Sequence, residues 1–526
     1  MLIDDFLTRT AARLPDKVAC VVGGRRLTYA EYETASNRLA HALIDAGIQP
    51  GDRVAVFMEN RVEVPIAMFG ILKAGAAFVV INATTKPDKL CYILNDCRAS
   101  AVILNRRSQD AIDAIVSRVD SVRCLITRGD LPPEVAESGA AKLHYLDFDK
   151  DVAAFPTKRP GPRRIDMDLS AIVYTSGSTG RPKGVIATHR SMMAAAMSIV
   201  EYLENVEEDI VLNVLPLSFT YGLYHVLMMA YLGATLVLEQ SFAYPFQVVQ
   251  RLRQERVTGF PGVPTMFAVL TQMKGIEPAD LDTVRYVTNA GAALPVAHLE
   301  RLRGLFRKAR IFSMYGLTEC VRVSYLQPEE LDQRPDSVGT GMPNQQVDVV
   351  DEDGVPLPPG QVGELTVRGS HVMKGYWDLP EETARVLRPS RSGFDNVLYT
   401  GDLFRMDEQG YLYFVSRKDD IIKSRGEKVS PREVENVICE LPEVLEVAVI
   451  GVPDDVLGEA VKAIVVLAEG ATLGQGDVVR HCGRRLESFM VPRYVEFRDC
   501  LPKTDTGKIK RAVLREEGVT DTQETR

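Results

Sequence analysis

The 526-residue sequence has few of the features that mark secreted or metal-binding proteins. It contains one tryptophan and eight cysteines, with no Cys-x-x-Cys pair and no cluster of cysteine with histidine at metal-ligand spacing. Scattered cysteines of this kind are typical of reduced thiols in the cytosol, so we predict a cytoplasmic protein. The cysteines are Cys20, Cys91, Cys97, Cys124, Cys320, Cys439, Cys482 and Cys500.

The sequence also lacks a surplus of positive charge and a long apolar run. Its 62 Lys and Arg against 71 Asp and Glu give a net charge of −9, which argues against coating of nucleic acid or anionic membranes but not against a small anionic ligand. Residues 1–5 carry acids where a signal peptide carries basic residues. Residues 65–81 are the most apolar, but Lys73 interrupts them and they are shorter than the about 20 residues of a membrane span. We therefore expect a buried helix and strand there, and no transmembrane segment.

Apolar periodicity predicts a layered α/β protein. The helical pattern of residues 29–44 alternates with short apolar runs such as 54–58 and 101–104, which indicates mainly parallel sheets. Residues 345–415 contain short runs broken by turn residues, which favours antiparallel β structure. Residues 431–467 have the pattern of a helix and two strands, typical of a compact α+β unit.

These patterns predict two domains and a tail. Residues 1–416 are expected to form a large N-terminal domain of two layered α/β subdomains and a β-rich subdomain. Residues 417–514 are expected to form a small, mobile α+β C-terminal domain. Residues 515–526 have no apolar periodicity and are predicted to be disordered. Residues 155–167, rich in proline and basic residues, are predicted to be an exposed connection between two subdomains.

A hydroxyl- and glycine-rich loop after an apolar strand predicts phosphate binding. Its sequence is Tyr174-Thr175-Ser176-Gly177-Ser178-Thr179-Gly180-Arg181-Pro182-Lys183-Gly184. Small residues let backbone N–H groups and hydroxyls surround phosphate oxygens, and Lys183 adds a positive charge. The loop is not a Walker A motif, because no Ser or Thr follows Lys183. Its expected position between a strand and a helix argues against a flexible linker.

Four further motifs follow in the order found in one enzyme superfamily. They are Tyr315-Gly316-Leu317-Thr318-Glu319, Tyr399-Thr400-Gly401-Asp402, Arg417-Lys418-Asp419-Asp420-Ile421-Ile422-Lys423 and Pro502-Lys503-Thr504-Asp505-Thr506-Gly507-Lys508-Ile509-Lys510-Arg511. With the loop, they make the chain resemble the acyl-adenylate-forming (AMP-binding) superfamily of acyl-CoA synthetases, peptide-synthetase adenylation domains and luciferases. The resemblance implies two half-reactions: a carboxylate and ATP give acyl-AMP and pyrophosphate, and a thiol then gives a thioester and AMP.

The resemblance also assigns catalytic residues. Lys508 would reach from the C-terminal domain to the substrate carboxylate and the α-phosphate, where it would offset the charge that builds as one anion attacks another. Glu319 would bind Mg²⁺, the expected metal ion, through a hard carboxylate oxygen. Thr318 and Lys183 would contact phosphates.

The remaining nucleotide contacts follow from the same resemblance. Tyr315 would stack on adenine, Asp402 would accept from both ribose hydroxyls, and Arg417 would reach the ribose or the α-phosphate. Ser416 departs from the family, which usually has glycine before this arginine. The other expected contacts are Thr175, Ser176, Gly177, Ser178, Thr179, Gly180, Gly291, Ala292, Ala293 and Gly316.

The acyl group is predicted to lie against mainly apolar residues. Phe219 stands where many acyl-CoA synthetases carry histidine, and Thr220 stands where amino-acid-activating relatives carry aspartate. An ammonium group buried without a partner is costly, so a free α-amino acid is disfavoured and a hydrophobic aliphatic or aromatic acid is favoured. Arg322 could bind a second carboxylate or polar group, or form an intramolecular salt bridge. The expected lining is Phe219, Thr220, Tyr224, Val263, Thr288, Ala290, Gly291, Met314, Arg322 and Val323.

The sequence leaves two alternatives open for the molecule whose thiol accepts the acyl group. Asp419 matches the family's hinge, and Lys423, Arg425 and Gly426 would shape a pantetheine tunnel after domain rotation. The first hypothesis is an acid–CoA ligase of the kind that acts in fatty acid metabolism, and the second is an enzyme that loads the phosphopantetheine of a carrier protein. A third hypothesis, of a different class, is a nucleotide sensor or scaffold without turnover. A monomer and a homodimer are both compatible with the sequence.

Overall fold

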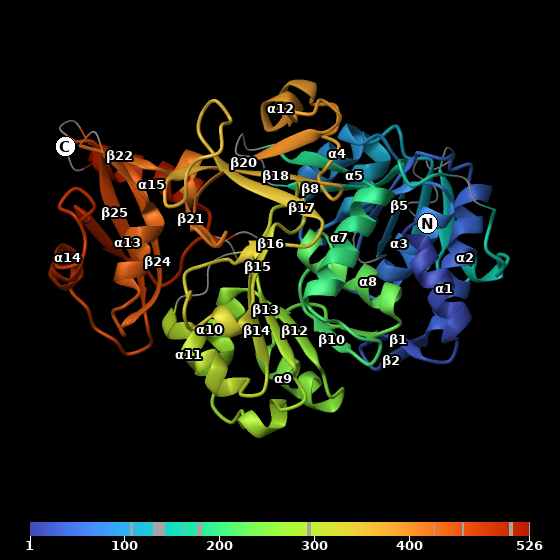
Figure 1. Ribbon diagram of the computed structural model, residues 1–526. Helices are drawn as coiled ribbons and strands as arrows, with labels where there is room; N and C mark the ends of the chain where they lie inside the picture. The colour runs from blue at the N-terminus through green and yellow to red at the C-terminus, as the bar shows by residue number, and fades with distance from the viewer. Residues whose placement is uncertain are drawn as a thin grey trace.

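Four β-sheets and the helices around them make up the computed structural model of the chain, in the part that is described here (Figure 1). The described residues are 1–105, 109–129, 143–161, 164–175, 181–291, 296–425, 427–454, 457–503 and 509–524. Within these ranges, no helix combines the length and the apolar character needed to cross a membrane.

The first sheet has seven strands in the order β7-β6-β5-β3-β4-β8-β9. All neighbours are parallel except β8 and β9. Every residue of β4 is buried, as expected for a parallel strand covered on both faces. The bounds are β3 (Arg53–Phe57), β4 (Ala77–Ile81), β5 (Ala99–Asn105), β6 (Cys124–Arg128), β7 (His144–Asp147), β8 (Leu169–Thr175) and β9 (Lys183–Thr188).

The second sheet has nine strands in the order β16-β15-β14-β13-β12-β10-β11-β1-β2. Between β14 and β1, each strand is parallel to the next in this order. The pairs β14–β15 and β15–β16 at one edge and β1–β2 at the other edge are antiparallel. The bounds are β1 (Val18–Val22), β2 (Arg25–Thr28), β10 (Ile210–Asn213), β11 (Thr235–Leu238), β12 (Gly259–Gly262), β13 (Tyr286–Asn289), β14 (Arg310–Tyr315), β15 (Ser324–Leu326) and β16 (Thr340–Gly341).

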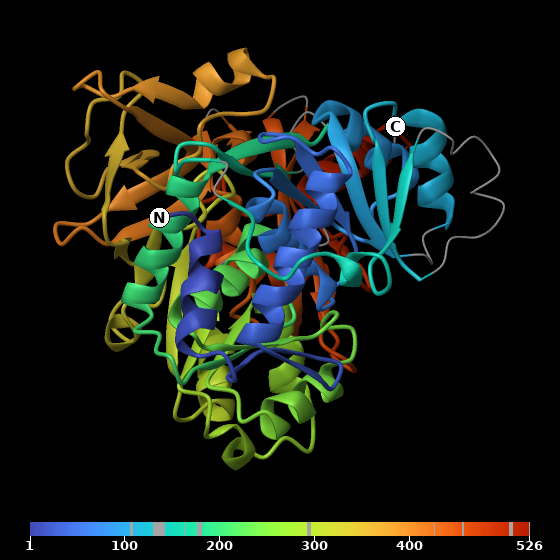
Figure 2. The same cartoon turned by 90° about the vertical axis from the view of Figure 1, so that its right-hand side faces the viewer.

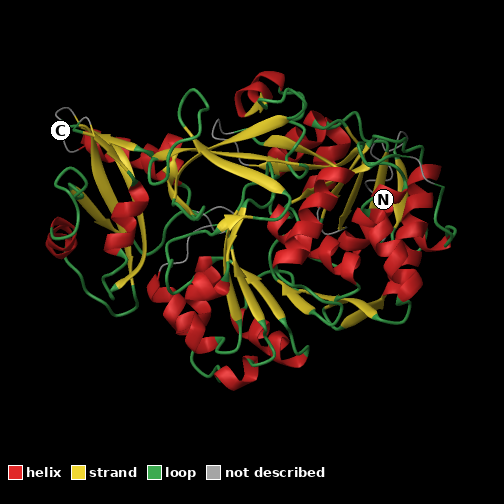
Figure 3. Ribbon diagram, in the orientation of Figure 1, coloured by secondary structure: helices red, strands yellow, loops and turns green. Residues whose placement is uncertain are grey.

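Helices cover both faces of these two sheets (Figures 2 and 3). The largest apolar core joins one face of each sheet to α1 (Asp4–Arg13), α2 (Tyr29–Asp45), α3 (Glu63–Lys73), α7 (His189–Tyr202) and α8 (Thr220–Leu232). The opposite face of the seven-stranded sheet carries α4 (Pro87–Asp96) and α5 (Gln109–Arg118). The opposite face of the nine-stranded sheet carries α9 (Pro245–Gln254), α10 (Pro264–Gln272) and α11 (Val296–Leu305). The helix patterns in the sequence therefore become the layers between and outside the sheets.

The predicted β-rich region forms the third sheet, in the order β17-β18-β20-β19, with β21 also paired to β20. All its pairs are antiparallel, as the frequent turn residues indicate. The bounds are β17 (Gln345–Val350), β18 (Val362–Gly369), β19 (Leu387–Pro389), β20 (Asn396–Met406) and β21 (Leu412–Arg417), with α12 (Pro380–Val386) beside them.

The small C-terminal domain lies at the left of Figure 1 and contains the fourth sheet. Its strands are β22 (Ile422–Ser424), β23 (Glu427–Val429), β24 (Val444–Asp454), β25 (Gly458–Leu467) and β26 (Tyr494–Phe497), with α13 (Pro431–Ile438), α14 (Gln475–Gly483) and α15 (Arg511–Glu524). The Ser430 hydroxyl donates to the Val415 carbonyl at 2.6 Å and so ties this domain to β21. The predicted α/β class with a large and a small domain is confirmed, and the boundary at residue 416 remains a proposal.

The prediction of a disordered tail is wrong for most of its length. Residues 511–524 form α15, Leu514 is fully buried, and Arg515 pairs with Asp420 at 2.7 Å. A single buried leucine and an ion pair attach the start of this helix, which is too little apolar pattern to recognise from the sequence.

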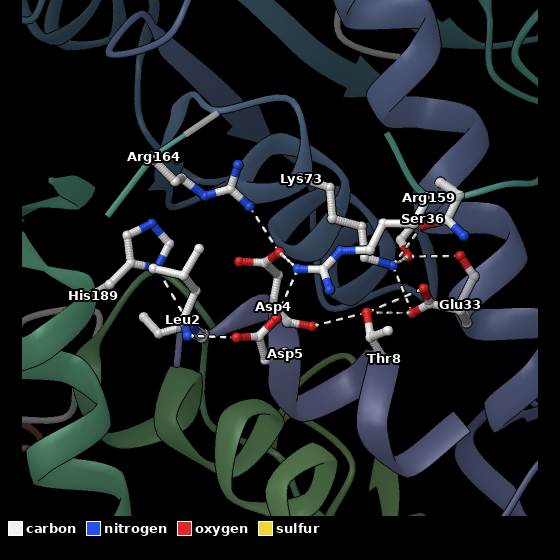
Figure 4. Close-up of polar contacts among 12 residues, drawn as sticks. Leu2, Asp4, Asp5, Thr8, Glu33, Ser36, Lys73, Arg159, Arg164 and His189 are labelled. Atoms are coloured by element: carbon white, nitrogen blue, oxygen red, sulfur yellow. Dashed lines mark hydrogen bonds and ion pairs between the residues drawn. The ribbon is translucent and has the colours of Figure 1, made fainter. Parts of the chain in front are cut away.

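The described residues of the proline-rich connection 155–167 are exposed or half-buried, as predicted, but two of its arginines turn inward. Arg159 and Arg164 from this segment form ion pairs of 2.5 and 2.7 Å with Asp4, whose side chain is fully buried (Figure 4). Beside them, the buried Lys73 ammonium contacts the Glu33 carboxylate at 2.6 Å and the Ser36 hydroxyl at 2.7 Å. We call these residues the Asp4–Lys73 network. It joins the N-terminal helix to the connection and to α3.

Candidate active site

The predicted phosphate loop joins two antiparallel strands. Thr175 at the end of β8 pairs with Lys183 at the start of β9, so the loop does not lead directly into a helix as predicted. Gly184 follows Lys183, and a Cβ atom there would lie 2.7 Å from the Ile172 side chain, so the close approach of the two strands requires glycine. Ser176, Gly177, Ser178, Thr179 and Gly180 lie outside the described residues.

Lys183 is held by an acid that the sequence analysis missed. Its ammonium contacts the Glu382 carboxylate of α12 at 2.8 Å and lies 5.4 Å from the centre of the Tyr376 ring. The opposite charges of Lys183 and Glu382 attract each other, and a phosphate could replace the carboxylate as the partner of the lysine. No spacing signal joins two residues this far apart in the sequence.

Glu319 is positioned by Tyr376, which lies shortly before α12 and its Glu382. The Tyr376 hydroxyl donates to Glu319 Oε1 at 2.7 Å, and the Met373 N–H donates to the Glu319 carbonyl at 2.8 Å. Burial and the neighbouring carboxylate raise the pKa of Tyr376, so the phenol stays a neutral donor. Thr318 precedes Glu319 and is partly exposed. Lys183 and Glu319 thus both contact Tyr376, the lysine over its ring and the glutamate at its hydroxyl.

Tyr315, Asp402 and Arg417 form a second polar group close to the first. The Tyr315 hydroxyl donates to Asp402 Oδ2 at 2.5 Å, and Arg417 Nε lies 3.4 Å from Asp402 Oδ1. Arg417 pairs with Asp402 across strands β21 and β20. The Tyr315 ring packs edge-on against Phe404, with 4.8 Å between the ring centres. Burial, followed by the Asp402 charge, raises the pKa of Tyr315 well above its usual value.

The two polar groups are neighbours, because Glu319 of the first and Tyr315 of the second lie four residues apart in one segment. Arg417 lies close enough to Tyr376 for its positive charge to lower the pKa of the phenol, against the larger effect of burial, which raises it. The structure therefore brings together predicted residues of four motifs. Their assignment to ATP remains a prediction, as does that of Gly316, and Ala292, Ala293 and Lys508 lie outside the described residues.

The predicted acyl lining comes from α8, β13, β14 and the turns beside them. Thr220 begins α8 and Phe219 precedes it, and both are partly exposed, as is Val263. Gly291 is exposed and has a φ of +91°. The buried members of the predicted lining are Tyr224, Thr288, Ala290, Met314, Arg322 and Val323.

Arg322 is buried among aromatic side chains that the sequence analysis did not include. It is 4% exposed, and its guanidinium carbon lies 5.0 Å from the centre of the Tyr221 ring. The Tyr221 hydroxyl donates to the Thr288 carbonyl at 2.9 Å and also contacts the Thr288 hydroxyl. The guanidinium makes a hydrogen bond with the Tyr202 hydroxyl. Among the described residues, no Asp or Glu forms an ion pair with Arg322, and its Nε has no hydrogen-bond partner, so the alternative of an intramolecular salt bridge is not found there.

The predicted hinge and thiol residues lie on the C-terminal side of β21. Asp419 is exposed in a single turn of 3-10 helix, Lys418–Asp420. Lys423 is exposed on β22, and Arg425 lies in the turn after it, with a φ of +56°. Arg425 lines a cavity of about 310 Å³ together with Phe489 and Arg493. Gly426 lies outside the described residues, and the roles of these residues remain predictions.

These contacts bring the side chains of Lys183, Glu319, Asp402 and Arg417 into one polar region of the chain. Comparison with known proteins identifies the family. The AMP-binding enzyme family matches residues 7–377, and its C-terminal domain family matches residues 433–508. The chain belongs to the AMP-binding enzyme family, as its motifs predicted.

Individual relatives are similar over nearly the full length of the chain. A long-chain-fatty-acid–CoA ligase of Bacillus subtilis (strain 168) is 34% identical, with 98% of this chain and 94% of that protein covered. A feruloyl-CoA synthase of an Amycolatopsis species is also 34% identical, with 96% and 97% covered. The crystal structure of the anthranilate CoA ligase AuaEII with anthranoyl-AMP has a TM-score of 0.90 at 28% identity, with 99% and 98% covered. The predicted enzyme class, an AMP-forming acyl-CoA synthetase, is confirmed at this level.

Proposed function

We propose that the protein activates a hydrophobic carboxylic acid with ATP and transfers its acyl group to CoA. In the first step a carboxylate oxygen attacks the α-phosphorus, a P–O bond to pyrophosphate breaks, and acyl-AMP forms. In the second step the CoA thiol attacks the acyl carbon, loses its proton and displaces AMP. The relatives described above are named as ligases or synthetases of acids to CoA, which supports CoA over a carrier protein as acceptor.

One observation carries the proposal. Tyr376 contacts both Lys183 and Glu319, and Tyr315 and Arg417 both contact Asp402, so residues of four separate motifs lie near one short segment, residues 315–319. A cation, two carboxylates and an exposed arginine next to a phosphate-type loop match the needs of a nucleotide triphosphate. A scaffold without turnover would not need all of these groups together.

The residues have distinct tasks in this proposal. Lys183 exchanges Glu382 for phosphate oxygens, and Asp402, oriented by Tyr315, accepts from the ribose hydroxyls. Lys508 would come from the C-terminal domain to offset the charge on the attacking carboxylate and the α-phosphate. Asp419 would serve as the hinge about which the small domain rotates. The rotation would move Lys508 away from the active site and bring the thiol tunnel there for the second step.

Glu319 would hold a magnesium ion, which would help to neutralise the charge of the phosphates. Mg²⁺ is commonly held by one or two carboxylates and substrate phosphates rather than by a cage of protein ligands. Among the described residues, no group of three His, Cys, Asp or Glu side chains is placed to hold a metal. When bound, the ion would neutralise phosphate charge, while Tyr376 holds the Glu319 carboxylate in place.

A cytoplasmic location is part of the proposal. All eight cysteines are free and six of them are buried, as expected for a protein that stays in a reducing compartment.

Pyrophosphate release from ATP, measured across a panel of carboxylic acids, tests the proposal. We expect release that depends on the acid, and thioester formation when CoA is added. A holo-carrier protein in place of CoA should give no faster transfer. ATP binding without release for any acid would support a nucleotide sensor and contradict the proposal.

A further inference from the structure

Arg322 is a buried cation with no acid to neutralise it in the described part of the chain. Its Nε has no hydrogen-bond partner, and the residue is 4% exposed. Burying an ionised group costs several kcal/mol unless it is paired. The other deeply buried cations differ, because Lys73 contacts Glu33 at 2.6 Å and Arg164 contacts Asp4 at 2.7 Å.

The groups around Arg322 stabilise a cation only in part. The Tyr221 ring presents its electron-rich face at 5.0 Å, and Tyr202 offers a hydroxyl. His225 also lies within the electrostatic reach of Arg322, and burial followed by the arginine charge lowers the pKa of His225 to about 3. The histidine is therefore neutral at physiological pH and adds no second charge. A cation–π contact and a hydroxyl leave the charge of the arginine without a counter-ion.

The backbone holds Arg322 in this place by a strained turn. Val321 has a φ of +67°, which is rare and strained for a β-branched residue. The Arg322 N–H donates to the Cys320 carbonyl at 2.7 Å, and the Val323 N–H donates to the Tyr315 carbonyl at 2.9 Å. The turn thus connects Arg322 directly to the segment that carries Tyr315 and Glu319. Strain of this kind concentrates at ligand sites.

Arg322 also adjoins the predicted acyl lining. Tyr221, whose ring faces the guanidinium, donates its hydroxyl to Thr288, and the Tyr202 hydroxyl contacts Met314 Sδ at 3.1 Å. Thr288 and Met314 belong to the predicted lining. A substrate that occupies this lining would come within reach of the unsatisfied guanidinium.

We propose that Arg322 binds a second carboxylate on the acid substrate, so that the enzyme acts on dicarboxylic acids with an apolar spacer. This inference rests on the proposed function, because it refines the acid that is adenylated. One carboxylate would react with ATP, and the other would pair with the guanidinium, whose planar array of donors matches a carboxylate. Tyr202 and Tyr221 would flank the ion pair and exclude water from it. Arg322 is then a specificity-determining residue.

Pairs of acids of equal chain length test the proposal. For each length in a series, kcat/KM is measured by pyrophosphate release with an α,ω-dicarboxylic acid and with its monocarboxylic counterpart. The wild-type protein should prefer the diacid at one or more lengths. In Arg322→Met the ratio of diacid to monoacid should fall at least about 30-fold, which corresponds to about 2 kcal/mol. Arg322→Lys should keep part of the preference, and the exposed Arg190→Met should keep all of it.

Each other outcome contradicts the proposal. A wild-type preference for the monoacid at every length, or an unchanged ratio in Arg322→Met, overturns it. A preference for length-matched keto acids over diacids, lost in Arg322→Met, shows that the arginine serves a neutral oxygen and also overturns it. If no acid gives turnover, the proposed function fails, and calorimetry of diacid binding to wild type and Arg322→Met decides the binding claim separately. Turnover of monoacids by Arg322→Met shows that the variant is folded.

Discussion

Lys73 and Arg322 are both buried cations, but their surroundings are opposite in kind. Lys73 in the Asp4–Lys73 network contacts a carboxylate, a hydroxyl and an amide oxygen at 2.6 to 2.8 Å. Arg322 contacts an aromatic face and a hydroxyl, and no carboxylate of the described residues pairs with it. The network needs nothing from outside the chain, whereas the arginine needs an anion.

This difference separates charges that serve folding from charges that serve a ligand. In the network, α1, α2, α3 and the connection of residues 155–167 are held together by ion pairs with little solvent access (Figure 4). At the active site, Lys183 has a carboxylate partner that a phosphate can replace. Changes in the network should therefore alter stability, and changes at the site should alter activity or specificity.

The largest effect is expected from Asp4→Ala. The substitution leaves Arg164, whose side chain is 3% exposed, without its acid, and breaking a buried ion pair costs about 3–5 kcal/mol. Urea unfolding should show this loss in the free energy of unfolding, with kcat unchanged in the folded fraction. The exposed Asp16→Ala is the control. A loss below about 1 kcal/mol would show that the network is no more than a surface cluster.

The next effect is expected from Lys508→Ala, which extends the comparison to a cation assigned to the substrate. Loss of one preorganised electrostatic donor lowers a rate by about 10² to 10³. Acyl-AMP formation, followed by pyrophosphate exchange, should fall by at least this factor, while thioester formation from supplied acyl-AMP and the free energy of unfolding stay unchanged. Equal loss of both half-reactions would contradict the role given to Lys508.

A smaller effect is expected from His189, which accepts a hydrogen bond from the Ile3 N–H at 3.3 Å. Burial is the main cause that lowers the pKa of His189 from 6.5 to about 4; Arg164 lowers it further, against Asp4, Asp168 and Asp5. The unfolded chain therefore binds more protons between these pH values, and stability falls by about 1.4 kcal/mol per pH unit as the pH drops through them. His189→Gln should reduce this slope in urea titrations at several pH values, and the exposed His144→Gln should not. An equal slope in all three proteins would show that His189 is protonated in the folded state.

The smallest effect on stability is expected from Val321→Gly, on the other side of the comparison. Glycine adopts a positive φ without a steric cost, but it gains entropy in the unfolded chain. The free energy of unfolding should rise by at most about 1 kcal/mol, while the preference for diacids should weaken because the turn holds Arg322 less firmly. A clear loss of stability with unchanged specificity would show that the turn serves folding alone.

The two regions also differ in how well the sequence predicted them. Residues 29–44 carry a strong periodic pattern and form α2 close to the expected bounds, and the apolar run of residues 65–81 contains most of α3 and all of β4, the expected helix and strand. The motifs around Lys183 and Glu319 could be recognised in the sequence because each is contiguous, and the roles that they suggest remain predictions. The same reasoning missed Glu382 and Tyr376, because contacts between distant segments leave no spacing to detect.

The surroundings of a side chain were harder to predict from the sequence than its place in a motif. Arg322 was noted from its position, but only the structure shows that it is buried beside Tyr221 and Tyr202. The inward turn of Arg159 and Arg164 was missed because a proline-rich basic segment has the composition of an exposed connection. Burial depends on the packing of several elements, which composition does not report.

The most direct test of the central claim is the identity and ratio of the products formed from ATP, an acid and CoA. Chromatography of a quenched reaction should show acyl-CoA, AMP and pyrophosphate in equal amounts, with acyl-AMP detectable when CoA is left out. Formation of ADP and phosphate, or pyrophosphate without any thioester in the presence of CoA, would contradict the account.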